Sequence, residues 1–348
     1  MKNKVIPNPI LPAAGVRRSN AAGVRRSNAA DGGSGPPSGG HHDDRTSNPG
    51  KPGRVLSDHS TPSNAFMRCR RPFVMGTFNA CTVREEARLV ELAHCAEERG
   101  VEILGVQEHR RVHTDDQIVY HKVEGCTFII LSAWRNEAQA ETGGVGLMLG
   151  SRARKALRRV YQHIDRILIA EFSDNPVTTV IVVYSPTNVA PTEEAEKFFK
   201  DLATAVRGVP AHNFLAILGD FNASLGPEDT PFPYHDSTNR NGANLTALLT
   251  EHELLAANTL FQKRQGKRWT FQDRATCMVR QLDYILVRRK WRNSILNAEP
   301  YSSFSSVGSD HRVVCVGAMY MFCSYFVLVW FHILEAMGIG HLICIDYF

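Results

Sequence analysis

The sequence has no cysteine pair at the spacing of a metal-binding motif. Its eight cysteines include no CxxC, and no histidine stands at zinc-finger spacing from a cysteine pair. Disulfide frameworks are typical of short secreted domains, whereas this chain has 348 residues, 43% of them hydrophobic. We therefore expect reduced cysteines in an intracellular protein, and neither a zinc finger nor a disulfide scaffold.

The N-terminus lacks the apolar core of a signal peptide, because prolines and polar residues interrupt residues 5–11. Large apolar residues are sparse throughout residues 1–70, where Gly, Pro, Ser, Asn and Arg dominate, which is typical of a disordered tail. The octapeptide AAGVRRSN occurs twice in succession over residues 13–28, which indicates slippage in the coding sequence rather than a solenoid repeat. Its Arg pairs fit a nucleic-acid contact or a nuclear signal, and equally a solvated tail without a role.

Positive charge is unevenly distributed along the chain. Residues 1–72 hold twelve Lys or Arg against four Asp, a net charge of +8, so the total of +5 leaves −3 for residues 73–348. The basic pI therefore says little about the partners of the folded part. Three local basic runs remain as candidates for contacts with DNA phosphates, with a solvated surface as the competing interpretation. They are residues 152–159 (RARKALRR), 263–268 and 288–292 (RRKWR).

Apolar runs bounded by turn residues predict one α/β domain over residues 71–317, with a core of roughly 250 residues. Strands are expected over residues 73–79, 101–106, 127–132, 143–149, 164–172, 177–184, 214–218, 268–272, 281–287 and 313–316. Helical spacing predicts three helices, over residues 85–99, 192–206 and 245–255, the last preceded by a polar loop over 227–241. Many strands and polar strand ends favour two packed β-sheets with helices outside.

The C-terminal segment carries no charge from residue 313 to residue 331. Its length alone permits a membrane span. Three interpretations compete with that one: a last core strand in its first residues, a stretch without selected structure, and an aggregation-prone run. Because Gly317, Ser324 and several aromatic residues interrupt it, we expect no membrane span, and anchoring by a tail over residues 318–348 remains the alternative.

Residues 213–226 (NFLAILGDFNASLG) carry the most informative polar pair. An apolar run over 214–218 stops at Gly219 and is followed by Asp220 and Asn222. Since side chains alternate along a strand, both would point the same way if the extended geometry continues. The carboxylate can take a proton or hold a metal, and the amide can hold a developing oxyanion. The competing interpretation is a strand that ends in an Asx turn.

The other strand ends supply single polar residues, and each is weak evidence when it is considered alone. Together they form an ordered set: Asn79, Glu108, Tyr184, Asp220 with Asn222, Asp283, and Asp310 with His311. The segments that carry them, with their neighbours, are TFNACTVR, ILGVQEHR, GGVGLML, VVYSPTN, ILGDFNASLG, RWTF, QLDYILV and VGSDHRVV. In this order the chain resembles the endonuclease/exonuclease/phosphatase superfamily over roughly residues 71–317. Within it, the chain is most similar to the endonuclease domain of LINE-type (non-LTR) retrotransposons, a domain type shared by craniofacial development protein 2-like sequences.

The resemblance implies a four-layered α/β sandwich, two packed sheets flanked by helices, that cleaves a phosphodiester with a divalent metal. The metal is expected to be Mg²⁺, with Mn²⁺ as the alternative. A hard cation held by carboxylate and amide oxygens masks the charge of the phosphodiester and stabilises the pentavalent state. By resemblance, Glu108 is the principal metal ligand, Asn79 assists it, and Asp310 joins through water. Asp220 would orient or deprotonate the attacking water.

By resemblance, the remaining residues of the set contact the phosphate of the substrate or support those that do. Asn222 and Tyr184 would donate hydrogen bonds to its non-bridging oxygens. His311 would contact it as well, held by Asp283 in a pair that favours the imidazolium. The expected substrate-binding residues are Asn188, Thr270 and Ser309, the last as a support for His311.

One departure from the superfamily pattern is visible after the first strand. DNA-repair members carry Asn-x-Asp there, whereas this chain has Asn79-Ala80-Cys81 and so lacks one metal-side carboxylate. LINE-type domains commonly lack it too, which favours that subfamily. No reverse-transcriptase domain follows, so we expect a fragment, a degenerate copy or a host gene derived from such an element.

We expect an intracellular, nuclear, Mg²⁺-dependent endonuclease that nicks DNA. It would bind the phosphate backbone, with a hairpin near residues 235–245 in the minor groove by analogy. The sequence gives no sign of an obligate protein partner. The alternatives are a phosphatase or phospholipid phosphodiesterase of the same superfamily, and an inactive nucleic-acid-binding relic.

Overall fold

A computed structural model describes residues 71–112, 118–122, 128–132 and 143–319. The tail expected over residues 1–70 lies outside the described residues, as does the tail expected over 318–348 apart from its first two residues.

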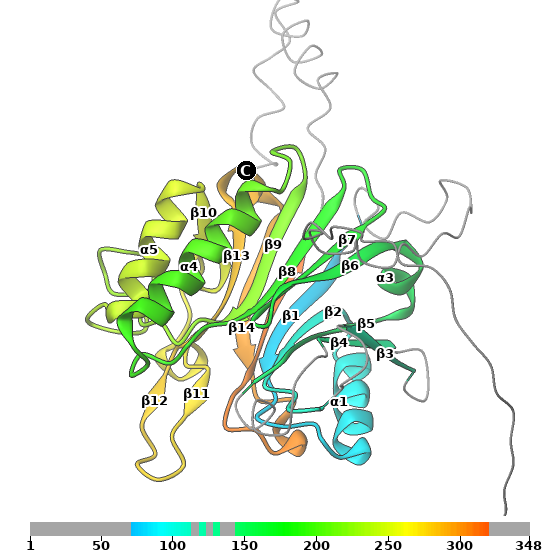
Figure 1. Cartoon of the computed structure of the whole chain (residues 1–348). Coiled ribbons are helices and arrows are strands. Elements are labelled where there is room, and N and C mark those ends of the chain that lie inside the picture. Colours follow the sequence, from blue (N-terminus) through cyan, green and yellow to red (C-terminus); the bar gives the residue numbers. More distant parts are fainter. Residues whose placement is uncertain (1–70, 113–117, 123–127, 133–142, 320–348) are drawn as a thin grey trace, which may run out of the picture. The chain divides into compact units, whose positions relative to one another are not determined.

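Two mixed β-sheets form the framework of the described part (Figure 1). The first sheet has the order β14-β15-β1-β2-β5-β4-β3. Its strands are β1 (Phe73–Asn79), β2 (Val101–Gln107), β3 (Ile118–Lys122), β4 (Phe128–Ser132), β5 (Val145–Leu149), β14 (Ile295–Tyr301) and β15 (Val313–Ala318). The second sheet has the order β10-β13-β9-β8-β7-β6. Its strands are β6 (Leu157–Ile164), β7 (Ile167–Phe172), β8 (Thr178–Tyr184), β9 (Phe214–Asp220), β10 (Leu254–Ala256) and β13 (Asp283–Arg288).

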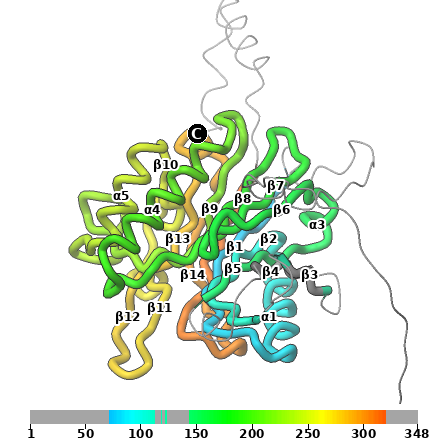
Figure 2. The backbone as a smooth tube through the Cα atoms, viewed as in Figure 1, coloured from blue at the N-terminus to red at the C-terminus, as the bar shows by residue number. Residues whose placement is uncertain are grey.

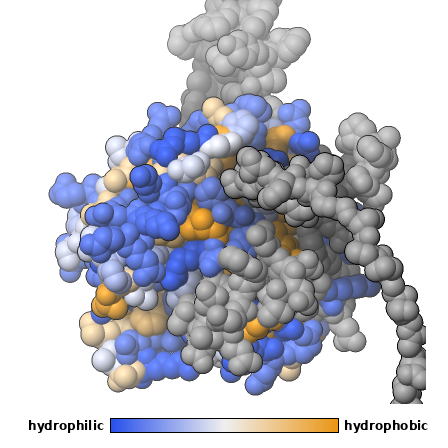
Figure 3. All heavy atoms as spheres, in the orientation of Figure 1, coloured by the Kyte–Doolittle hydropathy of each residue, from blue (hydrophilic) through white to orange (hydrophobic). Residues whose placement is uncertain are grey.

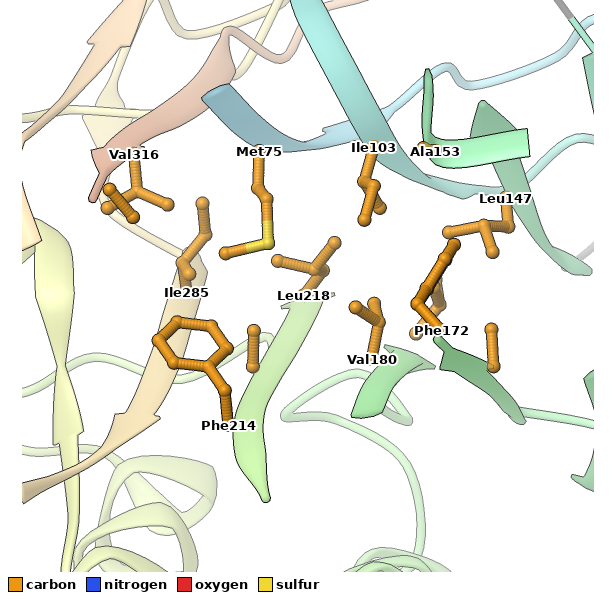
Figure 4. Packing of buried hydrophobic residues seen from close by; sticks show 14 of the residues in the cluster. Met75, Ile103, Leu147, Ala153, Phe172, Val180, Phe214, Leu218, Ile285 and Val316 are labelled. Carbon is orange, nitrogen blue, oxygen red and sulfur yellow. The ribbon is translucent and has the colours of Figure 1, made fainter. Parts of the chain in front are cut away.

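Apolar side chains of the two sheets meet in a common core. Met75 of β1 and Ile103 of β2 point toward Leu218 of β9 and Val180 of β8 (Figure 4), and all four are fully buried. Burying a side chain of this size contributes about 1.5–3 kcal/mol. Strands β8 and β9 are buried on both faces, and alternate side chains of each strand belong to this core and to the cluster on the other side of the sheet.

Helices cover the outer faces of the two sheets. Leu89 and Leu92 of α1 (Glu86–Glu98) pack in one cluster with Phe78 of the first sheet. Helices α4 (Thr192–Arg207) and α5 (Arg240–Glu251) cover the second sheet through side chains such as Leu202 and Leu245. The layers run helix, sheet, sheet, helix, which confirms the predicted sandwich; the path is traced in Figure 2. A short helix, α3 (Ser151–Ala156), was not predicted.

Gly219 lets β8 and β9 approach closely just before the polar pair. These strands pair in parallel, with Tyr184 beside Asp220. A Cβ at Gly219 would lie 2.2 Å from Cγ2 of Val183 and 2.7 Å from its carbonyl oxygen. Any side chain at this position would push the strands apart and displace Asp220.

The boundaries of one predicted helix and one predicted strand are wrong. The helix expected over 245–255 is α5, which begins at Arg240 because the Asn239 side chain caps it by accepting from Gly242 N at 2.7 Å. The strand expected over 268–272 is reduced to β11 (Phe271–Gln272).

The hairpin expected near residues 235–245 is absent, because residues 235–239 form no strand and α5 begins at Arg240. A hairpin occurs instead where β11 pairs with β12 (Val279–Arg280), and it extends away from the sheets (Figures 1 and 2). The 3₁₀ segments among the described residues are Ala257–Thr259, Gln265–Lys267, Arg289–Ser294 and Ser305–Val307.

The apolar C-terminal segment begins as a core strand. Strand β15 lies inside the first sheet, between β14 and β1. This confirms the interpretation that the first residues of the segment form the last core strand, two residues longer than the expected 313–316. Among the residues described here, no helix combines the length and the apolar character needed to cross a membrane.

Candidate active site

The ends of four strands meet at one edge of the sandwich. Asn79 at the end of β1 pairs with Gln107 at the end of β2, and Tyr184 at the end of β8 pairs with Asp220 at the end of β9. Asp283, the first residue of antiparallel β13, lies opposite Asp220. The parallel strand pairs therefore deliver residues of distant segments to the same place.

Asp220 is the centre of this group and is 2% exposed. Its Oδ2 accepts a hydrogen bond from Asn79 Nδ2 at 3.0 Å. The same Nδ2 also donates to Glu108 Oε1 at 2.9 Å. Asn79 thus links the two carboxylates and fixes their relative position.

Asn222 follows in a left-handed conformation, with φ of 48°. Asp220 Oδ1 accepts from its backbone N at 2.9 Å, so the extended geometry stops and the Asx turn is present. The Asn222 Nδ2 donates to the carbonyl of Ser185 at 3.2 Å. The Asx turn of the competing interpretation is therefore present, and the chemical roles of Asp220 and Asn222 stay predictions.

The surroundings of Asp220 bring its pKa close to neutral pH. Burial raises the pKa of Asp220, and the negative charge of Asp283 across the strand pair raises it further. His311, Asn79 and the backbone of Asn222 counteract part of this, and the resulting pKa is about 7. A carboxylate of this kind can accept a proton from water near neutral pH.

His311 and Asp283 form a buried carboxylate–imidazole pair. The His311 Nδ1 lies 2.9 Å from Asp283 Oδ2, and the two side chains are 6% and 0% exposed. Burial alone would lower the pKa of His311, but the charge and hydrogen bond of Asp283 outweigh it and raise the pKa to about 9. A pKa raised in this way favours the positively charged imidazolium at neutral pH.

Two of the predicted substrate-side residues support this pair. Ser309 Oγ donates to the carbonyl of Asn79 at 2.6 Å and accepts from His311 N at 3.0 Å. Thr270 is fully buried, and its Oγ1 accepts from the backbone N of Asp283 at 3.1 Å. The third, Asn188, is exposed and accepts from Asn241 N at 3.3 Å.

Glu108 occupies the other side of Asn79. Its Oε1 accepts from the Tyr184 hydroxyl at 2.8 Å, and its Oε2 forms an ion pair with Arg110. Burial and the nearby charge of Glu108 raise the pKa of Tyr184, which keeps the phenol protonated as a donor. Tyr184 thus holds Glu108 in this structure.

The donor types of the predicted metal residues fit a hard divalent cation. Glu108 and Asp310 offer carboxylate oxygens, and Mg²⁺ is commonly bound by one or two carboxylates while it keeps several waters. Asn79 directs its N–H groups at the carboxylates, and its Oδ1 accepts from Cys81 N at 2.9 Å. Two groups of three possible ligands are present among the described residues, and neither contains Glu108: Cys81, Asp310 and His311, and Asp220, Asp283 and His311.

The sequence did not point to several residues that shape the site. Arg110 pairs with Glu108, and Asn241 donates to the Pro186 carbonyl at 2.8 Å. Cys81, Glu108 and Arg110 all have a positive φ, between 52° and 56°, which non-glycine residues rarely adopt and which is common at functional sites. Amino-acid type gives no signal for these conformations, whereas an Asn just before a helix is a recognisable cap.

Two of the three basic runs lie at the opposite end of the sandwich. Within 152–159, Arg152 pairs with Glu102 at 2.6 Å, near the start of β2, whose other end reaches the site. Within 288–292, Arg288 donates to the Val209 carbonyl at 2.7 Å, ahead of the start of β9. In the third run, Lys263 forms an ion pair with Glu299.

Two further arginines beside the site come from separate segments of the chain. Arg274 lies 3.7 Å from Asp310, and the Arg312 guanidinium stacks 3.2 Å above the Trp269 ring. With His311 these residues line a pocket beside the hairpin. The face shown in Figure 3 is largely hydrophilic, with small hydrophobic patches.

Comparison with known proteins gives one consistent result. Residues 76–311 match the Endonuclease/Exonuclease/phosphatase family. Craniofacial development protein 2 of Bos taurus is 26% identical over 273 residues, which cover 75% of this chain and 43% of that protein. The chain thus spans less than half the length of this relative.

Solved structures agree on the fold. The 3'-5' exonuclease NExo from Neisseria meningitidis superimposes with a TM-score of 0.56 at 18% identity, over 71% of this chain and 100% of that one. The endonuclease domain of TRAS1, a telomere-specific non-LTR retrotransposon, gives 0.51 at 15% identity, over 72% and 99%. Since the family match spans β1 to His311, the chain belongs to the Endonuclease/Exonuclease/phosphatase family.

Proposed function

We propose that this chain is a divalent-metal-dependent phosphodiesterase that nicks DNA in the manner of a LINE-type endonuclease. One observation carries the proposal: Asp220 lies between a charged Asp283–His311 pair and the Asn79–Glu108 link. A base and a cation on either side of one position are what hydrolysis of an anionic phosphodiester requires.

In this proposal Asp220 takes the proton of the attacking water, since its pKa is about 7. The His311 imidazolium and one N–H of the Asn222 amide contact the non-bridging oxygens of the phosphate. A bound Mg²⁺, or Mn²⁺ in its place, would be held by Glu108 and Asp310 and would supply positive charge to the phosphodiester. Tyr184 and Arg110 orient the Glu108 carboxylate.

Two observations support DNA as the proposed substrate. The named activities of similar structures are those of nucleases, and a further NExo structure holds a product DNA hairpin. The exposed Arg274 and the half-buried Arg312 line the pocket beside His311, and arginines suit the phosphates of a nucleic acid. A nuclear location follows from such a substrate and belongs to the same proposal.

The test is conversion of supercoiled plasmid to open circles by the full-length protein, with Mg²⁺ or with chelator. We expect Mg²⁺-dependent nicking that falls by at least about 10²-fold in Asp220→Ala and His311→Ala. Glu196→Gln on the exposed face of α4 and His212→Ala before β9 serve as matched controls and should nick normally. A folded wild-type protein that nicks no plasmid at low salt would overturn the proposal, and turnover of a phosphoinositide or sphingomyelin instead would replace it.

A further inference from the structure

The polar group around Cys81 is not explained by the proposed hydrolysis. The Cys81 Sγ donates to Asp310 Oδ1 at 2.7 Å. The possible ligand atoms of Cys81, Asp310 and His311 all lie within 4.8 Å of one another. Cys81 and Asp310 are partly exposed, and the His311 side chain is 6% exposed. Asp310 and His311 line the pocket beside the hairpin, through which solvent ions can reach the group.

This ligand set suits a different cation from the one that Glu108 would bind. A thiolate sulfur, an imidazole nitrogen and a carboxylate oxygen are typical ligands of Zn²⁺ at about 2.0–2.3 Å. Mg²⁺ is a hard cation that takes oxygen ligands. Three protein ligands leave one position of a tetrahedral ion for water.

The contact between His311 and Asp283 also favours a metal site at this group. The His311 Nδ1 is engaged by Asp283 at 2.9 Å, so the lone pair for a metal would come from Nε2. A ligating histidine almost always has a carboxylate or carbonyl on its other ring nitrogen, which fixes the ring and its tautomer. Asp283 therefore serves this site as an orienting group.

We propose that Cys81, Asp310 and His311 form a site for a thiophilic divalent cation such as Zn²⁺, and that its occupancy inhibits the nuclease. On binding, the cation displaces the Cys81 thiol proton and the Nε2 proton of His311, which pass to solvent. It thereby withdraws His311 from the phosphate and Asp310 from the hard cation. The binding half stands without any nuclease activity, whereas the inhibition half rests on the proposed function.

The binding test is a titration of the full-length protein with Cd²⁺, followed by the ultraviolet thiolate-to-cadmium charge-transfer band, with Zn²⁺ as competitor. We expect Cys81→Ser to lose one equivalent of bound cation, and Asp310→Asn to weaken the same equivalent. Asp283→Asn should weaken it about 10–100-fold, as loss of an orienting partner does. Cys277→Ser, at an exposed cysteine of the hairpin, is the matched control and should titrate as wild type.

Equal Cd²⁺ stoichiometry and affinity in wild type and Cys81→Ser would overturn the proposed binding site.

The inhibition test measures nicking in excess Mg²⁺ with increasing Zn²⁺. The rate of each variant is normalised to its own rate without Zn²⁺. The half-inhibitory Zn²⁺ concentration should rise at least about tenfold in Cys81→Ser. An unchanged value would refute the inhibition. A protein that never nicks refutes the proposed function and leaves the Cd²⁺ titration interpretable.

Discussion

At the scale of single residues, the site contains two buried groups, Asp220 and His311, whose pKa values are both raised above their ordinary values. Burial and Asp283 raise the pKa of Asp220 to about 7, and Asp283 raises that of His311 to about 9 against the effect of burial. The same carboxylate thus acts on both the base and the cationic group.

The pH dependence of nicking follows from these two shifts. In the proposed mechanism nicking needs Asp220 deprotonated, so the rate should rise as pH increases through about 7. Nicking also needs His311 protonated, so the rate should fall as pH increases through about 9. We expect a bell-shaped profile of plasmid nicking rate with its maximum between these values, measured from pH 5 to pH 10 at constant ionic strength. A flat profile over this interval would contradict the assignment of both roles.

Replacing Asp283 should move both limbs of that profile to lower pH. In Asp283→Asn the His311 pKa falls from about 9 toward its ordinary 6.5, and the Asp220 pKa falls as well because a neighbouring negative charge is gone. We expect the maximal rate to drop at least about 10²-fold and the alkaline limb to shift by one or more pH units. The control Glu196→Gln should leave both limbs in place.

The identity of these residues could be predicted from the sequence, but their contacts could not. The order of Asn79, Glu108, Asp220 and His311 along the chain marks the family. The link from Asn79 to both carboxylates depends on how parallel strands are aligned, which spacing along the chain does not specify.

At the scale of elements, the position of Asp220 depends on close contact between β8 and β9. Gly219→Ala should cost about 1–3 kcal/mol of unfolding free energy, because its Cβ would meet Val183 at 2.2 Å. Urea denaturation measures this, and Gly317→Ala on β15 is the matched control, since nothing lies within 4 Å of its added Cβ. Equal urea midpoints for the two variants would show that the strands can separate without cost.

The start of α5 is tied to the turn that follows β9. Asn239 caps the helix at Gly242 N, and its Nδ2 also donates to the Asn222 carbonyl at 3.2 Å. Asn239→Ala should therefore lower the unfolding free energy by about 1 kcal/mol and also reduce nicking. Glu85→Ala is the control, since Glu85 is the N-cap of α1 and makes no side-chain cap bond. A variant that loses stability but keeps full nicking would show that the tie does not position Asn222.

Elements with a strong apolar pattern were predicted well, and weakly patterned ones were not. The strand over 73–79 and the helix over 192–206 match β1 and α4 to within one residue. Strand β6 lies within and after a basic run, and β10 has three residues, so neither shows a clear period of two.

At the scale of the whole described part, positive charge is divided between two ends of the sandwich. The arginines beside His311 are expected to contact DNA, whereas the run over 152–159 lies near the start of β2. Arg274→Gln should reduce the steepness of the salt dependence of DNA binding by roughly one unit in the logarithmic plot. The matched control is Arg158→Gln, which removes an exposed arginine of the basic run and should leave the slope unchanged. Fluorescence anisotropy of labelled duplex DNA across a salt series measures both slopes. A reduced slope in Arg158→Gln but not in Arg274→Gln would place the DNA-binding face at the other end of the sandwich.

The pairing of β1 with β15 also has a consequence for the proposed nuclease activity during synthesis of the chain. The first and last strands described lie side by side in the middle of one sheet, with Met75 opposite Val316. Such a pairing joins segments distant in the chain and tends to slow folding. His311 lies just ahead of β15, so a nascent chain has a full set of site residues only after most of it has left the ribosome. Partial translation products that end before residue 311 are therefore expected to leave DNA intact.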